Sequence, residues 1–183
     1  MKRAGTFVAT CVLALTGCLI PQDETLGSEP VPANQPPRIV ENQVSPQTRI
    51  IREFGSDSCR LSFELVVTDP DVNDRIDVNW YVDYAPGRMP VSSSSLAPTT
   101  SSSPLRDDRA TFDVDLSAAA SPLSAPGLHL VEAVVADRQL DLNTRLPFPV
   151  PRQNPDGGPG LQVVEGFAVT YAWTVETVAG GCL

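Results

Sequence analysis

The sequence has little positive charge: its only lysine is Lys2, and its only histidine is His129. Thirteen basic residues stand against 22 acidic ones among 183 positions, which gives a formal net charge of −9 at pH 7. Proteins bind nucleic-acid phosphates through clustered Lys and Arg side chains. A chain this acidic, with no basic stripe, is not expected to bind nucleic acid.

Aromatic residues are also few, at 6% of the chain, although hydrophobic residues in total reach 42%. That is enough apolar material for one core. The 18 prolines and 12 glycines interrupt the chain too often for long helices. We therefore expect one domain with appendages and little helix.

The sequence also lacks the motifs of common catalytic sites. A nucleophile with a histidine base would have to use His129, and no Gly-x-Ser-x-Gly motif accompanies it. No glycine-rich phosphate loop is present, and any carboxylate pair chosen from 22 acidic residues would be arbitrary. We expect a protein that is not an enzyme and has no catalytic residues or required cofactor, with a hydrolase as a distant alternative.

The N-terminus, by contrast, carries a clear pattern. Lys2 and Arg3 precede a short apolar run over 7–15, which is typical of a secretory signal peptide and too short for a membrane-spanning helix. The run leads into Leu15–Cys18, with the sequence Leu-Thr-Gly-Cys: an aliphatic residue, two small residues and a cysteine. Residues 1–17 are therefore predicted to be a signal peptide that is removed.

The Leu15–Cys18 motif resembles the lipobox of bacterial lipoproteins. The resemblance implies that the Cys18 sulfur receives a diacylglyceryl group, that the chain is cut after Gly17, and that a fatty acid such as palmitate acylates the new amine. Leu19 stands where an Asp retains enterobacterial lipoproteins at the inner membrane, so the resemblance places this chain at the outer membrane of a bacterial cell envelope. An ordinary signal peptide with an incidental cysteine is the alternative.

Residues 18–37 follow the predicted cleavage point and are polar, aperiodic and rich in proline. This composition predicts a lipidated cysteine on a flexible tether with a polyproline-II bias. Removal of 1–17 takes away Lys2 and Arg3, which leaves 11 basic against 22 acidic residues and a net charge of −11. We expect the tether to hold a domain at 38–183 off the lipid surface.

From Arg38 onward, alternation of apolar residues with period two predicts half-buried strands. The clearest strands are expected at 59–69, 75–84, 109–118, 128–137 and 166–177, with a weaker pair at 38–44 and 49–54. About seven strands without a convincing helix indicate an all-β fold, a single antiparallel β-sandwich with long loops. Trp80 stands in the middle of an alternating strand and is expected in the core.

Two stretches resemble the immunoglobulin-like, PKD-like and cadherin-like modules of bacteria. The sequence VTDPDVNDRIDVNWYVD at 67–83 is similar to their Asp-Pro-Asp turn and the strand with a buried Trp that follows it, and 124–137 is similar to a later strand. The resemblance implies one Ig-like sandwich. His129 departs from it, because an aromatic Tyr is usual at that position. The resemblance implies a fold and no activity.

Two long segments interrupt the expected strands. The Ser/Thr-rich segment at 91–108 is expected to be a mobile loop, with a short strand or a glycosylated patch as alternatives. The segment at 137–160 contains LPFPVP and is predicted either to offer a contact surface or to pack as a flap on its own sheet.

The four cysteines predict one disulfide. Cys11 would leave with the signal peptide and Cys18 would be lipidated, so that Cys59 and Cys182 remain as a pair in an exported protein. In the usual strand order both lie at the same end of the sandwich. A metal-binding pair is the alternative, although zinc needs four ligands.

Acidic residues crowd the turn after the strand at 59–69. Asp69, Asp71, Asn73 and Asp74 lie there, and Asp137 ends the strand whose following loop shares that end of the fold. Oxygen ligands from adjacent loops suit Ca²⁺, so a calcium site is one prediction. Hydrogen bonding within Asx turns, without a metal, is the alternative.

Together these patterns predict an envelope-anchored lipoprotein with a non-catalytic Ig-like module for binding or structural support. Its partners would be the membrane, through the N-terminal lipid, and a protein or glycan at the envelope surface. An accessory or docking subunit of a larger envelope complex is the alternative.

Overall fold

The structure is a computed structural model and describes residues 34–153, 160–180 and 182. The predicted signal peptide, the lipidation site at Cys18 and most of the predicted tether lie outside the described residues. Within that part of the chain the protein is all-β, and no helix is long and apolar enough to cross a membrane.

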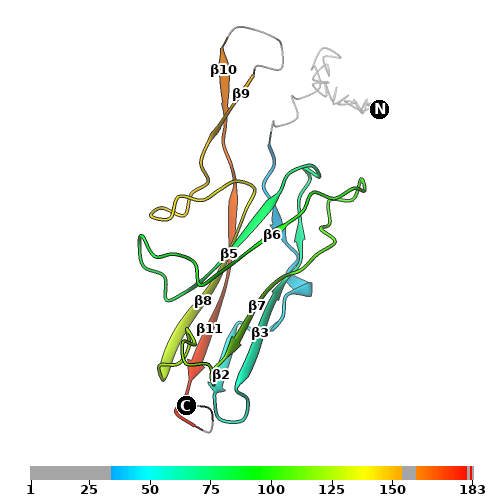
Figure 1. Ribbon diagram of the computed structural model, residues 1–183. Coiled ribbons are helices and arrows are strands. Elements are labelled where there is room, and N and C mark those ends of the chain that lie inside the picture. The colour runs from blue at the N-terminus through cyan, green and yellow to red at the C-terminus, as the bar shows by residue number, and fades with distance from the viewer. Residues whose placement is uncertain (1–33, 154–159, 181, 183) are drawn as a thin grey trace, which may run out of the picture. The chain divides into compact units, whose positions relative to one another are not determined.

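The described elements follow one another as short strands with a single turn of 3₁₀-helix (Figure 1). In chain order they are β1 (Arg38–Ile39), η1 (Glu41–Gln43), β2 (Ile50–Phe54), β3 (Arg60–Leu65), β4 (Val67–Thr68), β5 (Ile76–Val82), β6 (Ser92–Leu96), β7 (Ala110–Asp115), β8 (Gly127–Ala136), β9 (Val150–Gln153), β10 (Leu161–Val164) and β11 (Ala168–Thr177). Each strand predicted from period-two alternation is present, so the all-β prediction is confirmed.

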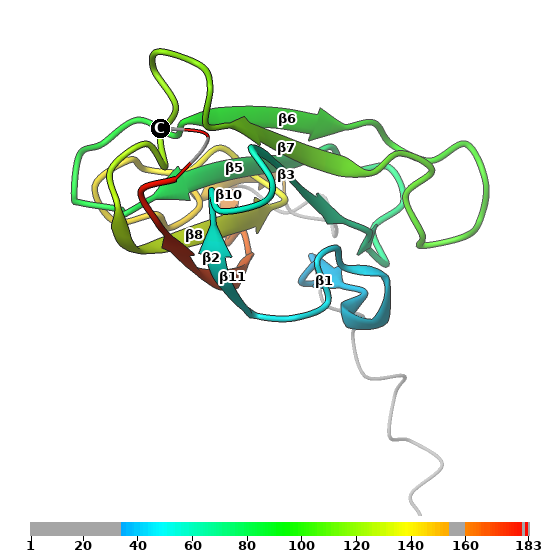
Figure 2. The same cartoon turned by 90° about the horizontal axis from the view of Figure 1, so that it is seen from below.

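The main sheet has five strands in the order β2-β11-β8-β5-β6. Its pairs are antiparallel except for β2, which lies parallel to β11. The other layer consists of the antiparallel pair β3–β7 and the short pair β1–β4, and only Val66 separates β3 from β4. Figure 2 shows the molecule from below, and β3 and β7 can be followed there beside β5 and β6 of the main sheet.

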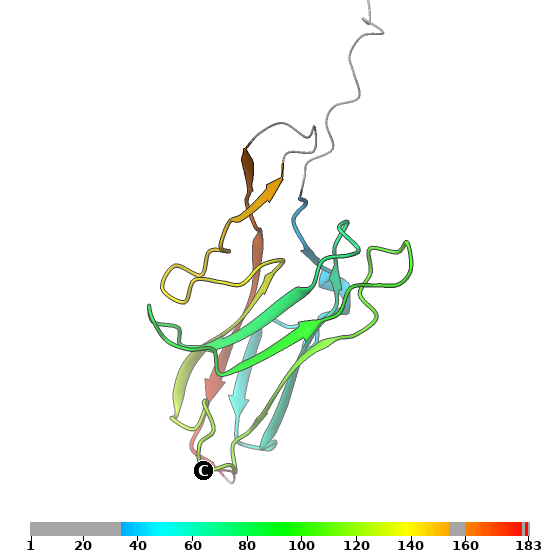
Figure 3. The same cartoon turned by 45° about the horizontal axis from the view of Figure 1, so that its top comes forward.

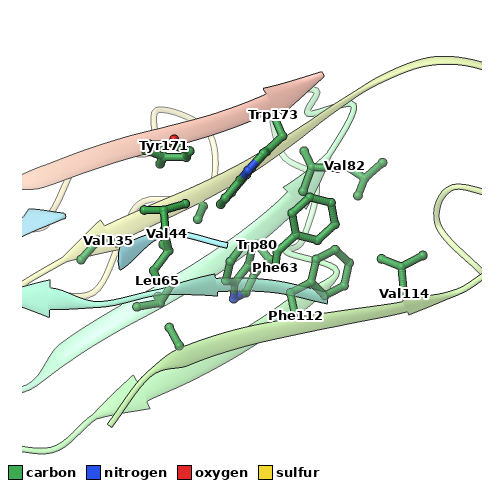
Figure 4. Packing of buried hydrophobic residues seen from close by; sticks show 14 of the residues in the cluster. Val44, Phe63, Leu65, Trp80, Val82, Phe112, Val114, Val135, Tyr171 and Trp173 are labelled. Carbon is green, nitrogen blue, oxygen red and sulfur yellow. The ribbon is translucent and has the colours of Figure 1, made fainter. Parts of the chain in front are cut away.

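Aromatic residues from both layers meet in the core (Figure 4). Phe63 of β3 lies 5.0 Å from Trp173 of β11, and Phe112 of β7 lies 5.5 Å from Trp80 of β5, measured between ring centroids. Both Trp side chains are fully buried, as predicted for Trp80. Such ring pairs add roughly 0.5–1.5 kcal/mol beyond the burial of their apolar area, so this cluster joins the two layers of the sandwich.

The outer face of β8 is also covered, which explains why this strand is apolar on both faces. Val134 and Ala136 form a second buried cluster with Tyr81 and Leu140 on that face. The segment after β8 lies over it, and its Arg145 guanidinium stacks 4.1 Å from the Tyr84 ring centroid. The flap interpretation of 137–160 is therefore correct for its first part.

Arg145 fixes this flap through charge as well as stacking. Its Nη1 lies 3.1 Å from Oε2 of Glu132, which β8 carries on the same face, and the Tyr84 hydroxyl donates to the Asn143 carbonyl at 2.9 Å. A glutamate on the face of a central strand needs such a partner because a buried unpaired charge is strongly destabilising. The outer face of β8 is thus closed by its own downstream segment.

Two strand pairs occur where loops were expected. In the Ser/Thr-rich segment at 91–108, β6 pairs with β5 and forms an edge of the main sheet, so the mobile-loop prediction is wrong for Ser92–Leu96 and the short-strand alternative is correct. Downstream of the flap, β9 and β10 form a separate antiparallel pair. They bring the described strands to eleven, against about seven predicted.

Cys59 and Cys182 form a disulfide with their Cα atoms 5.4 Å apart, which confirms the predicted pair. Cys59 immediately precedes β3, and Cys182 follows the end of β11. The bond therefore links the start of one layer to the end of the other across 123 sequence positions.

Candidate functional site

The candidate site lies where the β4–β5 turn, the start of the flap after β8 and the first described residues of the chain come together. Figure 3 shows this region at the end of the sandwich where β9 and β10 also lie. All of the predicted acidic ligands are in this region, and the structure assigns each carboxylate a partner.

Asp137 follows β8 directly and is buried. Its Oδ2 accepts a hydrogen bond from Asn34 Nδ2 at 2.6 Å, and its Oδ1 accepts one from the Phe167 backbone N–H at 2.8 Å. The same Asn34 amide donates to the carbonyl of Glu165 at 2.9 Å. Burial raises the pKa of Asp137 above its ordinary value, although the Phe167 and Asn34 donors partly oppose this.

Asp71 holds the next residue of the incoming chain. The backbone N–H of Gln35 donates to Asp71 Oδ2 at 2.6 Å. Asn34 and Gln35 are therefore fixed by two carboxylates that come from different loops. The chain enters the domain between the β4–β5 turn and the residue that follows β10.

The deepest charges in this region belong to Asp69 and Arg106, whose side chains are both fully buried. Arg106 Nη2 lies 3.0 Å from Asp69 Oδ2 and also donates to the Asp71 carbonyl at 3.0 Å, while Nη1 donates to the Val72 carbonyl at 3.0 Å. Burial raises the pKa of Asp69, opposed by the Asp71 N–H and by the Arg106 charge. One arginine from the 91–108 segment thus organises the acidic turn.

The remaining predicted ligands do not form a metal site with these residues. Asp74 Oδ2 lies 3.0 Å from Arg138 Nη1, and Asn73 is exposed. Within the described ranges no group of three or more His, Cys, Asp or Glu side chains could hold a metal ion. The Asp71 N–H donates to Asp69 Oδ1 at 3.0 Å, which is the predicted Asx-turn bond. Arginine pairing and turn chemistry therefore give these carboxylates partners without a metal, and the calcium site stays a prediction.

Sequence reasoning found the acidic residues but missed Arg106. A basic residue within a Ser/Thr-rich segment carries no local sign that it is buried, because its partner Asp69 lies 37 positions away. Comparison with known proteins finds no family model, curated protein or solved structure that matches this chain.

A second feature of the same end is an apolar patch on and before the β9–β10 hairpin. We define the apolar hairpin patch as the exposed side chains of Leu146, Phe148, Val150, Leu161 and Val163. Leu146, Leu161 and Val163 are each more than half exposed, at 64%, 65% and 58%. Single exposed apolar residues are ordinary, but a group of five in adjoining segments is a candidate contact surface. LPFPVP thus supplies three of its members, Leu146, Phe148 and Val150.

His129, the candidate catalytic base, occupies a different place in the structure. Its ring lies near the start of β8, where Nδ1 is 2.6 Å from Asp83 Oδ2 and Nε2 is 2.7 Å from the Ala125 carbonyl. Both ring nitrogens thus face protein acceptors. Burial by itself lowers the pKa of His129, but these hydrogen bonds and the Asp83 charge raise it above its ordinary value.

A shallow groove also lies on the outer face of β5 and β6. Its lining is polar: Arg75, Asp77, Asn79, Ser93, Ser94, Ser95 and Gln139. Several of these groups already bond one another, since Ser93 Oγ donates to Asn79 Oδ1 at 2.8 Å and Arg75 pairs with Asp77 at 2.9 Å. Much of the polar lining is therefore already paired within the protein, and the apolar hairpin patch is the stronger candidate for a binding surface.

Proposed function

We propose that this chain is an envelope-anchored bacterial lipoprotein with a non-catalytic, Ig-like module for binding or structural support. The observation that carries the proposal is the Cys59–Cys182 disulfide. Disulfides persist in exported proteins, and this bond leaves Cys18 as the only other cysteine after the predicted cleavage point. Cys18 is the residue that the Leu15–Cys18 motif offers for lipidation.

The strand order supports the Ig-like part of the proposal. In the Ig fold the second and fifth strands pair in one sheet, and the third, sixth and seventh strands are neighbours in the other. Here β3 pairs with β7, while β5, β8 and β11 are neighbours in the main sheet. On this proposal β9 and β10 form an insertion between the last two strands of the module.

The surroundings of His129 support a non-catalytic role. A general base must have a free nitrogen within reach of the proton that it removes. Both nitrogens of His129 instead lie within 2.7 Å of Asp83 and Ala125 acceptors, which favours a structural role for the ring. A hydrolase remains a distant alternative, to be tested on generic ester and glycoside substrates.

Replacement of Cys18 tests the anchor. We expect Cys18→Ser to abolish labelling by a metabolic fatty-acid probe and to leave the chain unprocessed or soluble, because no thiol remains to be alkylated. Cys11→Ser is the matched control: it removes a cysteine from the same leader and should label like the wild type. Equal labelling of Cys18→Ser and wild type would refute the proposal.

The alternative function is that of a docking subunit in a larger envelope complex, which the apolar hairpin patch favours because obligate interfaces are apolar. Isolation of the protein from crosslinked membranes separates the two functions. One stoichiometric envelope protein in the product would support the docking subunit. Recovery without such a protein, together with affinity for isolated glycans or foreign surfaces, would support an independent binding module.

A further inference from the structure

We propose that the apolar hairpin patch rests on the lipid surface beside the membrane anchor. This end of the module would then be held against the bilayer by its own side chains, in place of the expectation that the tether holds the domain off the lipid surface. The inference extends the proposed function, because it requires the chain to be anchored at Cys18. It assigns a lipid-contacting role to Leu161 and Val163 on β10 and to Phe148 before β9.

The first argument is the shape of the patch. The register pairs Val163 with Pro151 and Leu161 with Gln153, so the two exposed β10 side chains point to one face of the hairpin. Val150 stands opposite Val164 and so lies on the other face of the hairpin, where its side chain is 37% exposed. The face that carries Leu161 and Val163 is exposed, whereas Val164 on the other face of the hairpin is buried. Transfer of this apolar area out of water is favourable at about 25 cal/mol per Å².

The second argument is where the incoming chain arrives. Asn34 is bonded to the Asp137 carboxylate and to the Glu165 carbonyl. Glu165 is the residue directly after β10, which ends at Val164. The N-terminal segment therefore joins the domain next to the base of the hairpin, at the same end of the sandwich (Figure 3).

The third argument is the length of the connection. Sixteen residues lie between Cys18 and Ala33 inclusive. A fully extended chain gains at most about 3.3–3.6 Å per residue, so the lipid lies no more than about 55 Å from Asn34. A short connection raises the effective concentration of a second contact to about the millimolar range. A patch too weak to bind a bilayer alone can therefore bind one beside its own anchor.

The fourth argument is charge. The sequence from 146 to 164 contains two charged residues, Arg152 and Asp156, and so has no net charge, whereas the chain after 1–17 carries −11. Anionic lipid headgroups repel an acidic surface and attract a basic one. The hairpin is thus a segment that can approach a bilayer without the electrostatic penalty borne by the acidic remainder of the chain.

Fluorescence quenching by brominated lipids tests the contact. Trp80 and Trp173 are fully buried, so a new Trp on the surface reports its own surroundings. Leu161→Trp places the probe on the hairpin, and Leu128→Trp is the matched control. Leu128 is exposed to a similar degree, 74% against 65%, but lies at the start of β8 and therefore at the opposite end of the module.

Full-length lipidated protein is reconstituted into vesicles of phosphatidylethanolamine and phosphatidylglycerol that contain brominated phosphatidylcholine. We expect the added fluorescence of L161W to be mostly quenched and that of L128W to be unchanged. Both variants should melt like the wild type, since each replaces an exposed side chain. Equal quenching of the two variants, or none in either, would overturn the inference.

The same samples distinguish failure of the patch from failure of the anchor. Fatty-acid label and flotation with the vesicles report the anchor. A labelled, floating protein whose L161W fluorescence is unquenched overturns the patch alone and leaves the lipoprotein proposal standing. An unlabelled protein that does not float overturns the anchor, and with it the proximity on which the patch depends.

Replacement of the patch by polar groups provides the second measurement. In the L161W background, Val163→Asn and Phe148→Asn together should restore fluorescence in brominated vesicles while label and flotation stay at the wild-type level. Val91→Asn with Met89→Asn, which replaces two exposed apolar residues of the β5–β6 connection, is the control and should leave the quenching intact. Retained quenching in the patch variant would contradict the inference.

Discussion

The guanidinium of Arg106 and the carboxylate of Asp69 form an ion pair in which both side chains are fully buried, with Nη2 3.0 Å from Oδ2. The pair joins the 91–108 segment to the β4–β5 turn, and Arg106 reaches the carbonyls of Asp71 and Val72 as well. Burying two charges is unfavourable, so such a pair adds little net stability when complete. Removal of one partner, however, leaves the other charge without compensation.

Arg106→Met should therefore lower the free energy of unfolding by about 3–5 kcal/mol, the range for breaking a buried ion pair. Arg109→Met is the matched control: Arg109 pairs with Glu64, but its side chain is half exposed, so the loss should stay below about 1 kcal/mol. Urea unfolding measures both. The double variant Asp69→Leu with Arg106→Met should recover part of the loss, and similar small losses for Arg106→Met and Arg109→Met would contradict the buried pair.

The same contacts predict how the domain responds to calcium. Because the carboxylates of Asp69, Asp71 and Asp137 already bond Arg106, Gln35 and Asn34, we expect equal melting temperatures in EDTA, Ca²⁺ and Mg²⁺ at constant ionic strength. About 10 mM cation is sufficient, since weak extracellular calcium sites have Kd values near 10⁻⁴–10⁻³ M. A rise in Ca²⁺ alone that Asp71→Asn abolishes would contradict this expectation and support the calcium site.

The disulfide gives a third prediction. In the chain-entropy model, a bond that closes 123 positions stabilises the folded state by roughly 4–5 kcal/mol. Cys59→Ser should therefore unfold at clearly lower urea than the wild type, and reductant should shift the wild type in the same direction but leave the variant unchanged. Intact-mass analysis after alkylation is the check on the bond itself. Two alkylated thiols at Cys59 and Cys182 in protein isolated from cells would rule it out.

The strands that could be predicted from the sequence are those in which buried and exposed side chains alternate. In β5 and β7 the alternating residues Val78, Trp80, Phe112 and Val114 are buried, as the period-two pattern indicates. Strand β6 left no such signal, because it is a serine-rich edge strand with only Leu96 buried. Strand β9 was not predicted because it contains Pro151, and proline usually indicates a break in a strand. At an edge position, however, proline does not disrupt the hydrogen bonds between strands.

Of the candidate site, only the acidic residues could be predicted from the sequence. Aspartates in a turn are visible in the sequence as a cluster, whereas the groups that neutralise them are distant in sequence: Asn34 lies 103 positions from Asp137, and Arg106 lies 37 positions from Asp69. Local pattern cannot distinguish a paired carboxylate from a free one. The Asx-turn bond from the Asp71 N–H to Asp69 could be anticipated because it spans only two residues, and it is present.

The last prediction concerns His129 and Asp83. Both nitrogens of the ring face acceptors, an arrangement that is satisfied fully only when the ring carries two protons. The pKa of His129 is accordingly raised: burial lowers it, but the bonds to Asp83 and Ala125 and the Asp83 charge outweigh burial. A raised pKa in the folded state means that this stabilisation is complete below about pH 6.5, the unfolded value, and is lost as pH rises through the folded value.

We therefore expect the free energy of unfolding to fall by about 1 kcal/mol as the pH rises from mildly acidic to mildly alkaline. This value is smaller than is usual for a hydrogen bond to a charged group, because Asp83 is half exposed and solvent weakens the interaction. Asp83→Asn should flatten this dependence, since the carboxylate that favours the imidazolium is gone. His129 is the only histidine, so its ring-proton resonances in NMR report the pKa without overlap from another imidazole. A ring that titrates at the same pH in the wild type and in Asp83→Asn would show that Asp83 does not hold the charge on His129.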